Sequence, residues 1–169
     1  MVVEEEKASL EVAEKVKERN NMPLKNYTSS MPINRIFDGI QKMLVSAGAR
    51  QIAFDYDDNG KAVGIMFVVE TPKGRLPIQL PVRIEKIKRV FEKDEVYYKD
   101  EMQPYRTGWK NIHDWVAAQL AMLQTEMVKL EEIFLPYMAT QDGKTYFEIL
   151  ENRGFMLPEG NTKEREVIE

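Results

Sequence analysis

The sequence predicts an α+β fold, in which a three-stranded antiparallel β-meander packs against helices and one long helix in the C-terminal half forms the spine. Three observations support this prediction. Apolar residues alternate with period two in three runs between residues 51 and 80, and turn-forming residues separate the runs. Helical spacing of apolar residues appears before and after this stretch, at 31–47 and 82–93. The longest helical pattern covers 107–136, and neither Gly nor Pro interrupts it after Gly108 until Pro136.

Three regions differ in composition. Residues 1–24 hold 6 Asp/Glu and 4 Lys/Arg with few apolar positions. Leu10, Ala13 and Val16 step in threes, so a solvated helix around residues 9–18 and a disordered lead-in are both open interpretations. Residues 25–157 carry the apolar patterns and are expected to form a single domain. Residues 158–169 are expected to be a charged tail.

The first firm helix is predicted at 31–47. Ser30 is a suitable N-cap, and Pro32 lies at the helix start, where proline is tolerated. Gly48 stands where a left-handed residue would end the helix. The sequence therefore contains a start signal and a stop signal for this helix.

Three strands are predicted at 51–57, 62–71 and 75–80. A tight turn at 58–60 and a second turn at 71–74 join them. The middle strand is apolar on both faces, which indicates a central strand covered on both sides. Pro77 removes a backbone donor from the third strand, which suits an edge position.

The remaining elements are helical. A helix is predicted from about residue 82 to Lys93, then a loop over 94–106, then the long helix with Thr107 as N-cap, and a short helix over 145–152. A helix over 107–136 would be about 45 Å long, against about 40 Å for the width of a compact chain of this size. Its apolar stripe therefore predicts a homo-oligomer, through Val116, Leu120, Leu123, Met127 and Leu130.

Composition bounds the class of protein. The chain of 169 residues contains no cysteine, so disulfides and thiolate metal sites are excluded. The acidic N-terminus lacks the pattern of a signal peptide, and no apolar run reaches the roughly 20 residues that a membrane helix needs. These features predict a cytoplasmic protein that does not associate with membranes.

Charge is distributed unevenly. Residues 25–93 hold 12 Lys/Arg and 7 Asp/Glu, whereas residues 94–169 hold 8 Lys/Arg and 15 Asp/Glu. Cations arrayed on one surface can bind phosphates, and exposed tyrosines can stack on unpaired bases. The candidates for binding DNA or RNA are Lys73, Arg75, Arg83, Lys86, Lys88, Arg89 and Lys93, with Tyr56, Tyr97, Tyr98 and Tyr105 for stacking. The alternative is that these charges are only a solvated surface.

Catalytic signals are weak. His113 is the one histidine and lies on the apolar line of the long helix, which favours a structural role. Asp55 and Asp57 share a strand face, with Asp58 next to them, and such carboxylates can hold Mg²⁺ in nucleases. However, Asp58-Asn59-Gly60 is also what a hairpin turn requires. No glycine-rich phosphate loop and no GxSxG motif occurs, so binding without catalysis, metal or cofactor is favoured.

Four stretches in order resemble a family of small uncharacterised proteins of tailed phages and prophages. They are Lys25-Asn26-Tyr27-Thr28, QIAFDYDDNGKAVGIMFVV, LPVRIEKIKRVF and DWVAAQLAMLQTEMVKLEEIFLPYM. The resemblance covers about residues 25–150. It implies a phage or mobile-element product acting in the cytoplasm of a bacterial host, and it supplies no catalytic residue.

Three functions are therefore carried forward. The first is an accessory protein that binds nucleic acid or a nucleoprotein assembly through its basic surface. The second is a protein-interaction or inhibitor module that acts on a host or phage protein through the long helix or the acidic surface. The third is a metal-dependent nuclease built on Asp55 and Asp57.

Overall fold

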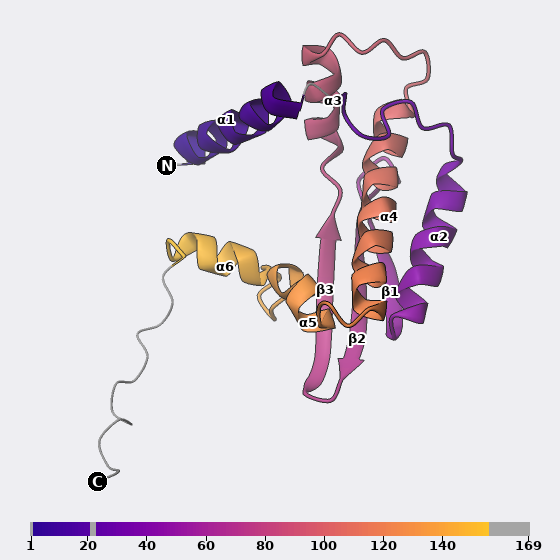
Figure 1. Ribbon diagram of the computed structural model, residues 1–169, viewed down its shortest axis with the longest axis vertical. Coiled ribbons are helices and arrows are strands. Elements are labelled where there is room, and N and C mark those ends of the chain that lie inside the picture. The colour runs from indigo at the N-terminus through magenta and orange to yellow at the C-terminus, as the bar shows by residue number, and fades with distance from the viewer. Residues whose placement is uncertain (1, 21–22, 156–169) are drawn as a thin grey trace. The chain divides into compact units, whose positions relative to one another are not determined.

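The computed structural model describes residues 2–20 and 23–155. The predicted charged tail at 158–169 lies outside the described residues. The elements run in the order α1 (Val2–Asn20), α2 (Ile33–Ser46), β1 (Ala49–Tyr56), β2 (Ala62–Thr71), β3 (Gly74–Pro81), α3 (Ile84–Lys93), α4 (Gln103–Gln124), α5 (Leu130–Phe134), a 3-10 turn η1 (Leu135–Tyr137) and α6 (Tyr146–Asn152). The predicted α+β class, with a meander and a long helix, is confirmed (Figure 1).

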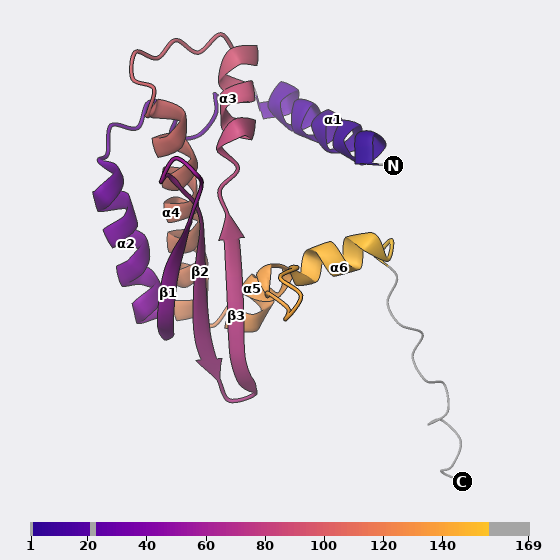
Figure 2. The same cartoon turned by 180° about the vertical axis from the view of Figure 1, so that it is seen from behind.

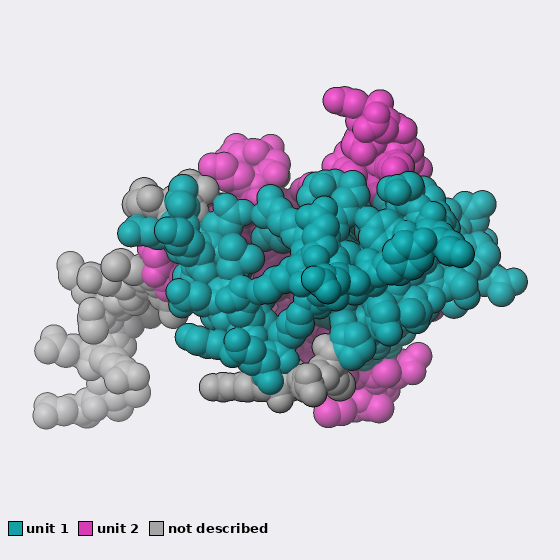
Figure 3. Space-filling model, turned by 90° about the horizontal axis from the view of Figure 1, so that it is seen from above, with its two compact units in different colours: residues 1–43, 82–118 teal, residues 44–81, 119–169 magenta. Residues whose placement is uncertain are grey.

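The chain divides into two compact units, each made of two segments (Figure 3). Unit 1 contains Met1–Met43 and Val82–Ala118, and unit 2 contains Leu44–Pro81 and the described residues from Gln119 on. The single domain predicted over 25–157 stays a prediction. Among the described residues, no helix is long and apolar enough to cross a membrane.

Unit 1 contains α1, α3, most of α2 and most of α4. Trp109 of α4 is fully buried and makes an edge-on ring contact with Phe37 of α2, with the ring centroids 4.8 Å apart. Two glycines allow helices to approach closely, because a Cβ at Gly39 would lie 2.7 Å from His113 Nε2 and one at Gly108 would lie 2.8 Å from Ile84 Cδ1. The core of this unit is Ile36, Ile40, Val82, Phe91, Tyr105, Thr107, Trp109 and Val116.

Unit 2 is built on the sheet, whose strand order is β1-β2-β3 with antiparallel pairing throughout (Figure 2). Phe67 of β2 packs edge-on against Phe134 of α5, with centroids 5.3 Å apart. Residues beyond η1 extend the β3 side of the sheet, since Ala139 N donates to Pro77 O at 2.8 Å and Ile78 bridges to Met138. Thus Pro77 lies on the outermost full strand, as predicted.

The second face of β2 is less covered than predicted. Ala62 and Gly64 are buried, but Met66 is 41% exposed and Val68 is only half-buried. Alternation of side chains places these residues opposite Ile65 and the rest of the core face. The second face of β2 is therefore buried at Ala62 and Gly64 but not at Met66, although all of these residues are apolar or small.

The predicted bounds of the long helix are wrong. The helix begins at Gln103 rather than Thr107 and ends at Gln124 rather than Pro136. Thr107 is buried inside α4, where its hydroxyl donates to Gln103 O at 2.9 Å and lies 3.1 Å from Asn26 O, so it is not an N-cap. Glu126, with a φ of 57°, closes α4 in a Schellman arrangement, because Glu126 N bonds Leu123 O and Met127 N bonds Met122 O.

Candidate nucleic-acid interface

The seven predicted cations are divided between the two compact units. Lys73 and Arg75 lie at the β2–β3 turn in unit 2. The other five lie on or next to α3 in unit 1: Arg83, Lys86, Lys88, Arg89 and Lys93. The larger group, on and next to α3, is therefore the candidate interface.

α3 has one apolar side that fixes its orientation within unit 1. Phe91 is buried, and Ile84 and Ile87 approach α4 where Gly108 leaves room. A larger residue than glycine at position 108 would collide with Ile84, so the small residue allows the close approach. This packing directs the polar side of α3 to the surface.

The polar side of α3 carries a basic stripe formed by Lys86, Arg89 and Lys93. These residues are spaced by three and four positions, so their side chains share one strip of the helix. All three are exposed. Lys88 lies off this strip and pairs with Glu85 at 3.0 Å, and that hydrogen bond raises the pKa of Lys88.

Side chains of helix α1 pair with cations of the basic stripe, which sequence analysis missed; Figure 1 shows one end of α1 beside α3. Arg89 Nη1 is 3.6 Å from Glu6 Oε1, and Lys93 forms an ion pair with Glu14. A third ion pair of reversed polarity joins Lys17 to Asp94, the residue after α3. The opposite charges of residues 1–24 and 25–93 were visible in the sequence, but composition does not say which side chains meet.

The Lys93–Glu14 pair affects both ionisable groups. The hydrogen bond to Lys93 lowers the pKa of Glu14, and the same contact raises the pKa of Lys93. Both groups are solvent-exposed, so the contact is a surface ion pair that salt screens. Lys86, by contrast, forms no ion pair within the described part of the chain.

Of the four predicted stacking residues, one stays fully available beside α3. Tyr97, in the loop after α3, is 82% exposed. Tyr98 packs on Phe91 with ring centroids 5.4 Å apart, and Tyr105 is buried. Tyr56 is exposed but belongs to unit 2.

A polar cluster around Asp114 fastens the 25–29 loop to α4. The Asp114 carboxylate accepts from Asn26 Nδ2 at 3.0 Å and forms ion pairs with Lys25 at 3.4 Å and with Lys110. His113 Nδ1 is 3.1 Å from Asp114 Oδ1. Asn26, Lys25 and Lys110 therefore surround this carboxylate, and His113 belongs to the same cluster.

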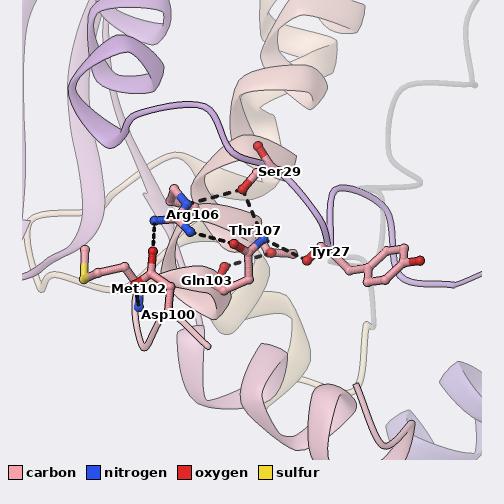
Figure 4. A network of polar contacts seen from close by, with 7 residues as sticks. All are labelled: Tyr27, Ser29, Asp100, Met102, Gln103, Arg106 and Thr107. Atoms are coloured by element: carbon pink, nitrogen blue, oxygen red, sulfur yellow. Dashed lines mark hydrogen bonds and ion pairs between the residues drawn. The ribbon is translucent and has the colours of Figure 1, made fainter. Parts of the chain in front are cut away.

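A second polar cluster holds the next part of the loop (Figure 4). Gln103 Nε2 donates to Tyr27 O at 2.8 Å and to Ser29 O at 3.1 Å. Arg106 donates to Ser29 O and to Asp100, the latter at 2.7 Å. The side chains at the start of α4 therefore serve the backbone of the loop.

The acidic residues at the end of β1 act in a turn. β1 ends at Tyr56, so Asp57 is not on the strand face of Asp55. Asp57 Oδ1 accepts from Asn59 N at 2.9 Å and from Lys61 N at 2.8 Å, as in an Asx turn. Over residues 2–20 and 23–155, no group of three His, Asp or Glu side chains is arranged to hold a metal ion.

The five residues predicted for self-association do not share one helix face. Val116 and Leu120 are buried within the chain, and Leu123 is half-buried. Met127 lies beyond the end of α4 and is 70% exposed, and Leu130 begins α5. Self-association itself stays a prediction.

Comparison of the chain with protein-family models, with curated proteins and with solved structures found no match.

Proposed function

We propose that the protein binds a polyanion, either nucleic acid or a nucleoprotein assembly, through the basic stripe of α3. The observation that carries this proposal is that Lys86, Arg89 and Lys93 lie together on the exposed side of a helix whose other side is anchored in unit 1. Cations fixed along one strip can replace the counterions condensed on phosphates. Tyr97, exposed just beyond the helix, suits stacking on an unpaired base, which favours single strands over duplex.

The biological setting is proposed from the resemblance in sequence alone. A phage or prophage product would act in the cytoplasm of its bacterial host, on nucleic acid during replication, recombination or defence. The four stretches quoted above are the support for this setting.

Replacing Lys86 with glutamine should weaken binding of a labelled single-stranded oligonucleotide by roughly five- to tenfold near 0.1 M salt, because one phosphate contact and its released counterion are lost. The slope of log affinity against log salt should also fall by about one. Fluorescence anisotropy with single- and double-stranded DNA and RNA, from low to physiological salt, measures both quantities. Lys86 is chosen because its loss breaks no ion pair of the described chain.

The matched control is Lys42→Gln, which removes the same charge from an exposed position on α2. Equal losses for the two variants would mean that only net charge matters, and α3 would not be the interface. If the unaltered protein binds none of the four probes at low salt, the proposal fails outright.

A second candidate function is a protein-interaction or inhibitor module, now favoured by apolar exposure in unit 2. Phe147 and Phe155 are exposed and contact each other with ring centroids 5.8 Å apart, and Tyr146 next to them is also exposed. Aromatic residues at the surface are typical of protein contact sites. The third candidate remains a metal-dependent nuclease built on Asp55 and Asp57, in which Asp57 Oδ1 also accepts the hydrogen bonds of the turn.

Self-association is proposed separately. Light scattering should give a mass above the 19.7 kDa of one chain, because exposed apolar side chains such as Met127 and Phe147 gain by burial between copies. The measurement should span a tenfold range of concentration. A constant monomer mass over that range would contradict the proposal.

A further inference from the structure

Helix α1 is held to α3 by charge rather than by apolar packing. From Val3 to Glu18, every side chain whose burial is described is exposed, including the apolar Leu10, Val12 and Val16. The ion pairs that join α1 to the α3 region are Arg89–Glu6, Lys93–Glu14 and Lys17–Asp94. Among the α1 side chains whose burial is described, none is therefore a buried apolar anchor.

Two of these ion pairs use the basic stripe directly. Arg89 and Lys93 are two of its three cations, and their α1 partners are carboxylates, which carry the same sign of charge as phosphates. An exposed pair of this type shifts an equilibrium by only about two- to fivefold, and salt weakens it. A nucleic acid presents a denser row of negative charge than Glu6 and Glu14 can.

We propose that α1 is an intramolecular competitor, whose Glu6 and Glu14 pair with Arg89 and Lys93 until a polyanion displaces them. The inference rests on the proposed function, because it concerns the same stripe. Lys86 stays open for first contact, and the other two cations become available as α1 leaves. The polyanion therefore binds the state in which α1 is detached. The apparent affinity equals the affinity of that state multiplied by the fraction of molecules that are in it.

The decisive variant is Glu6→Gln with Glu14→Gln, which removes the two carboxylates that face the stripe. It should bind a labelled single-stranded DNA about three- to tenfold more tightly than the matched control, because two weak pairs no longer oppose the ligand. The control is Glu4→Gln with Glu11→Gln, which removes the same charge from exposed positions of the same helix. No ion pair of Glu4 or Glu11 occurs among the described residues. The advantage should shrink as salt rises.

A second measurement follows α1 itself. Since the chain has no cysteine, nitroxide labels can be placed at Val12→Cys on α1 and Lys42→Cys on α2, both exposed positions of unit 1. We expect the distance distribution between the labels to shift or broaden when the oligonucleotide saturates the protein. The same change should appear without oligonucleotide in the Glu6→Gln, Glu14→Gln background.

The outcomes separate this inference from the proposed function. Equal affinity of the two glutamine variants, or an unchanged label distance in the saturated complex, would overturn the competitor role while leaving binding by α3 intact. Absence of binding in every variant at low salt would overturn the proposed function, and the competitor role with it. A tighter complex together with a moved α1 would support both.

Discussion

Replacing Trp109 with alanine should lower the free energy of unfolding by about 3–5 kcal/mol, the range found for removing a buried aromatic side chain. Trp109 is fully buried in unit 1 and makes an edge-on contact with Phe37 of α2. The alanine would leave a cavity between α4 and α2 and remove the ring contact as well. Urea denaturation followed by circular dichroism measures the loss without depending on tryptophan fluorescence.

The comparison variant is Trp115→Ala, which removes the other tryptophan of the same helix. Trp115 is only half-buried, so Trp115→Ala should lower the free energy of unfolding by less than Trp109→Ala does. An equal or larger cost at Trp115 would show that the core of unit 1 is not centred on Trp109. Trp109→Phe should recover part of the loss, because it keeps an aromatic ring against Phe37.

Replacing Asp114 with alanine should lower the free energy of unfolding by about 2–3 kcal/mol at pH 7, because hydrogen bonds to a charged group are lost and their donors are left without a partner. The donors are Asn26, Lys25 and Lys110, with His113 beside them. Asn26 has a φ of 64°, so the loop that it anchors is held in a left-handed conformation at this point. Thermal or urea unfolding at neutral pH measures the cost.

The same carboxylate predicts a pH dependence. Burial opposes its ionisation, but hydrogen bonds from Lys110, Asn26 and His113 outweigh that effect and hold the pKa of Asp114 well below its ordinary value of 3.8. A carboxyl with a lowered folded pKa stabilises the protein above its unfolded pKa and loses that contribution as the pH falls toward the folded value. The difference in stability between the unaltered protein and Asp114→Asn should therefore be constant above about pH 5 and shrink below about pH 4.

Asp38→Asn provides the control for this experiment, since Asp38 is an exposed carboxylate on α2 of the same unit. It should alter the stability little at any pH. A stability difference for Asp114→Asn that stays unchanged down to pH 2 would contradict the assignment, because the contribution would then not come from the charged carboxylate.

Local signals in the sequence predicted most of the elements. Turn residues at 58–60 and 71–74 separate the strands as expected, and Gly48, with a φ of 94°, ends α2 where predicted. The short helix predicted over 145–152 is found as α6, and Thr145 is its N-cap in a capping box with Glu148. These signals succeed because each depends on conformational preferences within a few residues.

The end of α4 carried no such signal. Glutamate, not glycine, occupies the left-handed position at Glu126, and the same is true of Glu95 after α3. Both helices end in the same hydrogen-bond pattern, in which Val96 N bonds Phe91 O after α3 as Met127 N bonds Met122 O after α4. Packing of Ile133 and Phe134 in the core of unit 2, with Phe134 against Phe67, favours the break over a straight helix.

The candidate site was predicted only in part. The spacing of Lys86, Arg89 and Lys93 on a helix follows from the sequence, since helical period alone places them on one strip. Their contacts with Glu6 and Glu14 do not follow from it, because the partners are about 80 positions away along the chain. These ion pairs form only because the tertiary fold brings α1 next to α3.

The sequence by itself therefore determined the α+β class, the order of the meander and the basic character of α3, because hydrophobic period, turn residues and charge are local properties. Only the tertiary structure decided where the long helix ends, that the lead-in forms a helix, and that carboxylates of this helix pair with two cations of α3. Those features arise between segments far apart in the chain, where packing and charge pairing outweigh the preferences of any single stretch.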